Sequence, residues 1–105
     1  MTTIRWTRAA ADDLDEIGRY LKDHQPAFAQ STVHTLYEAA ESLTQFPHRG
    51  RVDQEANTRE LVVAPLPYVI VDRVAGDVVF IARIVHGGSA CRRRRRGLRE
   101  PFDYN

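Results

Sequence analysis

The spacing of apolar residues changes once along the chain, and this change constrains the fold more than any other feature. Between residues 8 and 46 apolar side chains recur every three or four positions, which is the period of an α-helix. From residue 60 onward they form short runs rich in Val, Ile, Tyr and Phe, separated by Pro-Leu-Pro and Ala-Gly-Asp, a pattern typical of strands joined by turns. Helices and strands in separate blocks predict an α+β fold.

Two helices are predicted in the first block. The first begins after Thr7, whose side-chain oxygen can accept a hydrogen bond from a free N–H of the first turn, and ends near Asp23-His24. Pro26 suits the first turn of a second helix, because its missing N–H would have no partner there. Pro47 closes that helix after about residue 46. The short link between them predicts an antiparallel helical hairpin.

A short strand at Ile4-Arg5-Trp6 precedes the hairpin, and three strands follow it at residues 60–64, 68–71 and 78–85. Strands that follow one another through short turns pair in antiparallel fashion. The last strand is apolar on both faces, so we expect it in the middle of the sheet with the helices over one side. The polar segment 48–57 is predicted to be a loop. The expected order is β-α-α-β-β-β, a helical hairpin packed on a small, mainly antiparallel sheet.

Length and composition predict one globular domain. The chain has 105 residues, of which 43% are hydrophobic and 28% charged. No apolar run approaches the roughly 20 residues that cross a bilayer, and residues 1–5 lack the pattern of a signal peptide, so we expect a cytoplasmic protein without a membrane partner. A lone Cys91 cannot form an internal disulfide and has no ligand partner at metal-binding spacing, so no metal is expected.

Charge is distributed unevenly between the body and the C-terminal end. Residues 1–90 carry 9 Lys and Arg against 12 Asp and Glu, whereas residues 91–105 carry 6 against 2. The arginine run at 92–96 repels itself in any regular structure, so residues 1–87 are predicted to form the domain and residues 88–105 a basic, flexible tail.

Two arginines near strand ends are candidates for anion recognition. Arg59 and Arg83 could present fixed charge on the sheet, since a guanidinium fork matches phosphate and stays charged at working pH; Arg73 is a weaker third candidate. The alternative is that each arginine pairs with a nearby carboxylate such as Glu60 or Asp72. No motif for a nucleotide, a catalytic metal or a nucleophilic serine occurs, so no cofactor is expected.

His86 directly follows the last predicted strand, where an imidazole could transfer protons near neutral pH. Because Arg83 and His86 are an odd number of residues apart, they should face opposite sides of an unbroken strand. The two could converge only if the chain turned at Gly87 or earlier.

Residues 4–87 contain six segments whose residues, order and spacing together resemble the RelE/ParE superfamily of type II toxins. They are Trp6-Thr7, Ala10-x-x-Asp13-Leu14-x-x-Ile17-x-x-Tyr20-Leu21, Leu43-x-x-Phe46-Pro47-x-x-Gly50-Arg51, Arg59-Glu60-Leu61-Val62-Val63, Pro67-Tyr68-x-Ile70 and Ile81-x-Arg83-Ile84-x-His86-Gly87. The resemblance implies the same β-α-α-β-β-β fold. It also implies a cognate antitoxin that neutralises the toxin by laying an amphipathic segment over the sheet and helices, and contact with promoter DNA only through that antitoxin.

The resemblance implies two kinds of target. RelE-like members cut mRNA on the ribosome, and there Arg59, Arg83 and His86 would match positions important for cleavage, the arginines stabilising phosphate charge and the histidine acting as acid or base. ParE-like members poison DNA gyrase. The long hairpin, the Arg59-Glu60-Leu61 context and the lack of a Trp or Tyr soon after Gly87 favour a ParE-like toxin. There are two alternatives, an mRNA endoribonuclease and an inactive member of the family that serves as an antitoxin-binding module.

Overall fold

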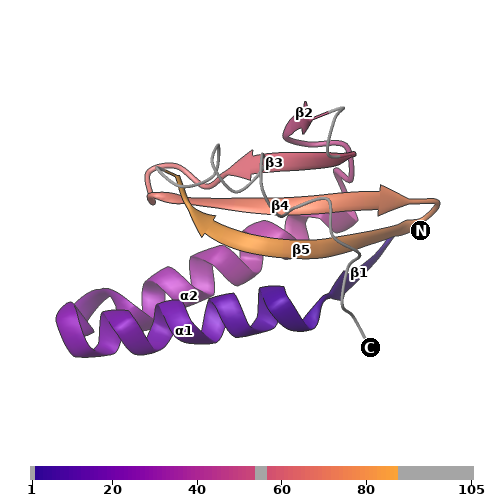
Figure 1. Ribbon diagram of the computed structural model, residues 1–105. Coiled ribbons are helices and arrows are strands. Elements are labelled where there is room, and N and C mark those ends of the chain that lie inside the picture. Colours follow the sequence, from indigo (N-terminus) through magenta and orange to yellow (C-terminus); the bar gives the residue numbers. More distant parts are fainter. Residues whose placement is uncertain (1, 54–56, 88–105) are drawn as a thin grey trace.

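The computed structural model describes residues 2–53 and 57–87, and there two α-helices pack on one face of a five-stranded sheet (Figure 1). The fold is α+β, as predicted. The elements are, in chain order, β1 (Thr3–Trp6), α1 (Arg8–His24), α2 (Pro26–Glu41), the 3-10 turn η1 (Ser42–Thr44), β2 (Arg51–Asp53), β3 (Thr58–Val62), β4 (Tyr68–Ala75) and β5 (Val78–His86).

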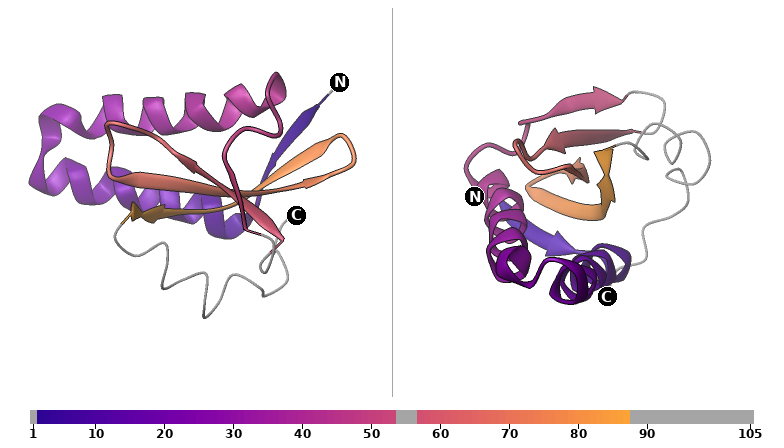
Figure 2. Two further views of the ribbon diagram at one scale, coloured as in Figure 1. Left: turned by 90° about the horizontal axis from the view of Figure 1, so that it is seen from above. Right: turned by 90° about the vertical axis from the view of Figure 1, so that its left-hand side faces the viewer.

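The strands lie in the order β1-β5-β4-β3-β2. β1 is parallel to β5, and each of the other neighbouring pairs is antiparallel. β5 therefore lies inside the sheet, between the first strand of the chain and β4, as expected of a strand that is apolar on both faces, while β4 is the middle strand of the five. Seen along the sheet in Figure 2, both helices cover the same face.

Thr7 connects the start of α1 to β5, as well as capping the helix. Its hydroxyl oxygen accepts a hydrogen bond from the N–H of Ala10 at 3.1 Å, which confirms the predicted N-cap. The same hydroxyl can donate to the carbonyl oxygen of Ile81 or of Ala82, which lie 2.9 and 3.0 Å from its oxygen. One buried side chain thus fixes where the helix leaves the sheet.

The main core lies between the helices and the sheet. Its fully buried large side chains come from α2, η1, β4 and β5, namely Leu36, Leu43, Ile70, Val79 and Ile81. A second, smaller cluster consists of Val69 and Val71 of β4 with Ala82 and Val85 of β5, and a register shift in the β4–β5 pairing lies at Val71/Asp72, where Ala82 has no pair. Successive strand residues point to opposite faces, so β4 and β5 are apolar on both faces, as the sequence indicated.

The second helix ends earlier than predicted. α2 stops at Glu41 rather than near residue 46, and η1 follows it. Ser42 donates from its hydroxyl to the carbonyl oxygen of Ala39 at 2.6 Å, a local bond that competes with helix continuation. The tighter turn places Leu43 in the core, where it is fully buried.

The segment 48–57 was predicted to be a loop, but residues 51–53 form the edge strand β2. None of its three residues is buried, so the sequence carries no row of apolar core positions there. The strand forms because its backbone pairs with β3. Gly50 precedes it with φ +100, and a Cβ there would lie 2.8 Å from the carbonyl oxygen of Glu60. Only glycine fits this close approach.

Strand bounds also differ from those predicted. β3 begins at Thr58 and ends at Val62, β4 continues to Ala75, and β5 includes His86. The predicted tail at 88–105, including Cys91, lies outside the described residues. Within residues 2–53 and 57–87, neither helix is long and apolar enough to cross a membrane.

Candidate functional site

Arg83 is bound by a carboxylate from the first helix. Its Nε and Nη2 donate to Oδ2 and Oδ1 of Asp13, at 2.7 and 3.0 Å, so the pair is bidentate. The two side chains are 32% and 12% exposed, respectively. The hydrogen bond to Asp13 raises the pKa of Arg83, so the guanidinium is charged throughout the working pH range.

Asp13 also closes an open sheet edge. β1 pairs with β5 only as far as Ile81, which leaves the following N–H groups on that side without a strand partner. The N–H of Ile84 donates to Oδ2 of Asp13 at 2.9 Å. A single carboxylate of α1 therefore binds both a side chain and the backbone of β5. Asp13 belongs to the segments that resemble the superfamily, but its contact with Arg83 was not predicted from the sequence.

Arg59 contacts the loop that follows η1. Its Nη1 donates to the carbonyl oxygen of His48 at 3.2 Å, and its Nη2 lies 3.1 Å from Nδ1 of the same residue. The second contact is a hydrogen bond when the imidazole carries its proton on Nε2. Arg59 thus joins β3 to the loop, and sequence reading did not single out His48.

Asp72 stands opposite Arg59 on β4 and is fully buried. Neither of its carboxylate oxygens has a hydrogen-bond partner among the described residues. Burial raises the pKa of Asp72 to about 7, and the charge of Arg59 opposes this rise. The carboxyl is therefore only partly ionised at neutral pH. Of the two carboxylates expected as arginine partners, Glu60 pairs with Arg51 at 3.4 Å instead.

His86 lies at the end of β5, beside the start of β4. Its ring meets that of Tyr68 edge-on, with centroids 5.9 Å apart and an angle of 80°. Burial raises the pKa of Tyr68, and the nearby Tyr20 adds to this effect. The N–H of Gly87 donates to the carbonyl oxygen of Pro67 at 2.7 Å, so the chain stays beside β4 past the strand end.

The structure does not bring the three candidate residues together. Arg59 pairs with Asp72 and Arg83 pairs with Val71, neighbouring residues of β4 that face opposite sides of the sheet. His86 pairs with Tyr68 at the far end of the same strand. β5 is continuous up to His86, so no turn before Gly87 redirects its side chain toward Arg83.

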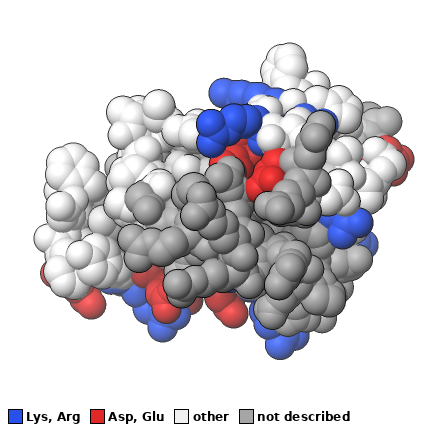
Figure 3. Space-filling model, turned by 45° about the horizontal axis from the view of Figure 1, so that its top comes forward, with Lys and Arg blue, Asp and Glu red and all other residues white. Residues whose placement is uncertain are grey.

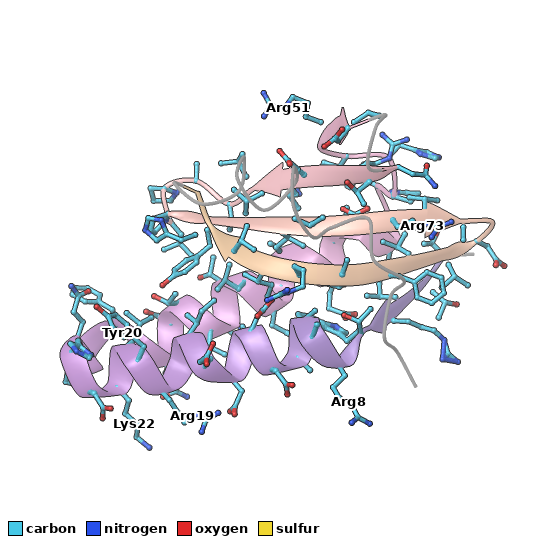
Figure 4. The ribbon with its side chains drawn as sticks, in the orientation of Figure 1. Arg8, Arg19, Tyr20, Lys22, Arg51 and Arg73 are labelled. Atoms are coloured by element: carbon cyan, nitrogen blue, oxygen red, sulfur yellow. The ribbon has the colours of Figure 1, made fainter. Side chains whose placement is uncertain are left out.

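The described surface is not uniformly basic. In Figure 3 basic and acidic side chains lie next to one another over the upper strands. Figure 4 shows that Arg8 and Arg19 project from α1 into solvent, away from the sheet, while Arg51 and Arg73 lie on separate strands. Among residues 2–53 and 57–87, no group of three or more His, Cys, Asp or Glu side chains could hold a metal ion.

An apolar groove runs along the helical hairpin. The helices approach closely where Gly18 faces Val33, since a Cβ at Gly18 would lie 3.1 Å from that side chain. The open groove beside this contact has a volume of about 1090 Å³, and its lining includes Leu14, Gly18, Pro26, Ala29, Val33 and Tyr37. Tyr37 is exposed and stacks on Trp6 of β1, with centroids 6.0 Å apart. The lining residues fall within the stretch 8–46 whose apolar side chains recur at helical spacing.

Comparisons with known proteins give a consistent result. The family described as "ParE toxin of type II toxin-antitoxin system, parDE" matches residues 4–90. Toxin RelE2 of Caulobacter vibrioides is 44% identical over 86 residues, which cover 82% of this chain and 96% of that protein. Y4kP of Sinorhizobium fredii, named as a candidate toxin, is 41% identical over 75 residues, covering 71% of this chain and 78% of Y4kP.

A solved structure shares the fold. It is described as a chromosomal ParDE TA system from P. aeruginosa, and the matching chain has a TM-score of 0.75 with 30% sequence identity. The match covers 82% of this chain and 96% of the other. Fold and sequence therefore lead to the same superfamily, which the six segments of the sequence had indicated.

Proposed function

The chain belongs to the ParE toxin family of type II toxin–antitoxin systems, and on that premise we propose that it acts by binding DNA gyrase and is neutralised by a cognate antitoxin. The proposal assigns the toxin function to residues 1–87. The observation that carries the choice of target is the ion pair of Arg83. A guanidinium that stabilises a cleaved phosphate must be presented to RNA, whereas here Asp13 occupies it in a bidentate contact.

The separation of the candidate residues supports the same choice. General acid or base catalysis needs groups within hydrogen-bond reach of one reacting centre. Arg59 and Arg83 lie on opposite faces of the sheet, and His86 lies at its end. This arrangement favours a toxin that binds its target protein over one that cleaves RNA.

An inhibition assay with purified gyrase tests the proposal. Increasing toxin should reduce the supercoiling of relaxed plasmid and leave linear DNA after protein denaturation, because a poison traps the cleaved gyrase complex. Full supercoiling at a large molar excess of folded toxin would contradict the proposal. The antitoxin added before gyrase should restore supercoiling.

An mRNA endoribonuclease is the second candidate, favoured by the likeness to Toxin RelE2. An endoribonuclease should produce new mRNA ends at ribosome-bound codons after induction, and Arg83→Ala should abolish these ends.

A third candidate is an inactive member that only binds its antitoxin. Growth arrest on expression of the toxin without the antitoxin would exclude it.

We propose that the antitoxin lays an amphipathic segment on the hairpin groove and reaches promoter DNA through its own DNA-binding part. An apolar groove flanked by an exposed aromatic ring suits the apolar face of such a segment. A short reading frame beside this one should encode the antitoxin.

A further inference from the structure

A solvent-exposed aromatic ring and an arginine side chain, those of Phe46 and Arg49, line the same hollow between η1 and β2. Phe46 is 60% exposed, so one face of its ring is open to a ligand. Phe46, His48 and Arg49 line an open hollow on the surface. Arg59 reaches the same segment from β3 through its two contacts to His48. An aromatic face and fixed positive charge therefore share one small surface.

Hydrogen bonds and close packing hold the segment from Phe46 to Gly50 in place. The N–H of Arg49 donates to the carbonyl oxygen of Phe46 at 3.1 Å, which closes a turn. Nη1 of Arg49 donates to the hydroxyl of Ser42 at 3.1 Å. The next residue, Gly50, packs directly against the backbone of Glu60. The ring and the guanidinium are thus positioned before any ligand arrives, which lowers the entropic cost of binding.

Arg49 and Arg59 carry fixed positive charge at this surface. Arg51, the next arginine, is paired with Glu60 and contributes little net charge. Asp72, the carboxyl opposite Arg59, is buried, and because its pKa is about 7 it does not fully offset the guanidinium at neutral pH. Each guanidinium has five N–H donors, more than the contacts described above use.

We propose that the surface formed by Phe46, His48, Arg49 and Arg59 binds one nucleotide of a single-stranded nucleic acid. The base stacks on the exposed face of Phe46, a contact that every base can make. The phosphate accepts hydrogen bonds from the guanidinium of Arg49, whose planar fork matches phosphate oxygens. An acidic peptide would satisfy the arginine but leave the ring without a stacking partner, so a nucleotide explains both features.

The surface is separate from the other candidate residues. On β4, Arg59 pairs with Asp72 and His86 pairs with Tyr68. These two positions of β4 are four residues apart, a distance of about 13 Å along the strand. The proposed binding does not depend on whether gyrase or mRNA is the target. A toxin without activity on gyrase could still bind nucleic acid here, and the two proposals can fail independently.

Fluorescence anisotropy with the full chain tests the proposal. The probes are a short labelled RNA strand, the DNA strand of the same sequence, the corresponding DNA duplex and a glutamate-rich peptide that contains one tryptophan. The arginine run at 92–96 binds any polyanion, so the informative quantity is the difference between matched variants at physiological salt.

Phe46→Leu is compared with Phe28→Leu, because Phe28 is similarly exposed, at 61%, but lies on α2. Phe46→Leu should weaken binding of either single strand about tenfold, whereas Phe28→Leu should change it by less than about twofold. Arg49→Gln should weaken binding as well, and Arg8→Gln, which removes an exposed arginine from the start of α1, should not. Amide NMR signals of Phe46, His48, Arg49 and Gly50 should shift when the strand is added.

Equal affinities of Phe46→Leu and Phe28→Leu would overturn the proposal, since all binding would then come from elsewhere in the chain. It would also be overturned if the peptide bound more tightly than both single strands and lost that binding in Phe46→Leu. That result would assign the surface to an acidic protein partner. Binding of RNA alone, or of both single strands, supports the proposal and identifies the preferred sugar.

Discussion

Asp13 and Arg83 are 70 residues apart in the sequence and form a bidentate ion pair between α1 and β5. The same carboxylate accepts the N–H of Ile84 where the pairing with β1 has ended. This contact fixes the helical hairpin against β5 and at the same time occupies the arginine that the sequence had marked for phosphate recognition.

Asp13→Ala should destabilise the protein by about 2–3 kcal/mol, because it leaves a partly buried guanidinium and a strand N–H without their charged acceptor. Urea unfolding followed by circular dichroism measures the change. Asp15→Ala is the matched control, since Asp15 forms an exposed pair with Arg19 on the same helix and should cost less than about 1 kcal/mol. Equal losses in the two variants would contradict the assigned role.

The double variant Asp13→Ala/Arg83→Ala provides a second check. If the ion pair carries much of the effect, the double variant should be more stable than the sum of the two single losses predicts, because the second substitution removes a charge that the first has already left unpaired. Strict additivity of the free energies of unfolding would mean that the two residues act independently.

Asp72 should make the protein less stable as pH rises. Its pKa is about 7 in the folded chain and 3.8 as the ordinary value, so the folded state binds more protons between these limits. The contribution of Asp72 to the free energy of unfolding is complete below about pH 4 and is lost as pH approaches 7. The free energy of unfolding falls by at most about 1.4 kcal/mol per pH unit in this range. Asp72→Asn should therefore gain stability relative to the unsubstituted protein as pH rises from about 4 to about 7, the range between the two pKa values. Parallel stability profiles of the two proteins would disprove the buried titration.

Gly50 should tolerate alanine less well than Gly76. Both have positive φ, but a Cβ at Gly50 meets the carbonyl oxygen of Glu60 at 2.8 Å, while nothing lies within 4 Å of one at Gly76. Thermal unfolding should show a loss of about 1 kcal/mol for Gly76→Ala and at least about 2 kcal/mol for Gly50→Ala. A smaller loss at Gly50 would mean that β2 and β3 can separate without cost.

Tyr37→Ala should weaken antitoxin binding at least about tenfold, because it removes an exposed aromatic side chain from the edge of the hairpin groove. Tyr20→Ala is the control, since Tyr20 is an exposed tyrosine of α1 that does not line the groove. Titration calorimetry with the protein from the neighbouring reading frame measures both. If the control variant lost as much affinity, the groove would not be the docking site.

Most of the fold could be predicted because local signals agreed with the tertiary structure. The hydroxyl of Thr7 marked the start of α1, Pro26 marked the start of α2, and the two-sided apolar run of β5 indicated a position inside the sheet. β2 could not be predicted, since pairing with β3 alone holds its polar residues in an extended conformation. The early end of α2 likewise depends on the tertiary burial of Leu43.

The candidate site was less predictable, because the partner of a charged side chain depends on tertiary geometry. The sequence offered Glu60 and Asp72 as arginine partners on grounds of proximity along the strands. The structure places Glu60 with Arg51 and brings Asp13 to Arg83 from a helix. No sequence pattern links residues 13 and 83, so only the packing of α1 against the β5 edge reveals the contact.

The linking number of a reporter plasmid in cells is the most direct test of the proposed action on gyrase. After brief induction of the toxin without its antitoxin, we expect a relaxed plasmid while mRNA ends stay unchanged. Co-expression of the antitoxin should restore negative supercoiling. Growth arrest with normal supercoiling and newly cut mRNA would rule out gyrase as the target and identify the chain as an endoribonuclease.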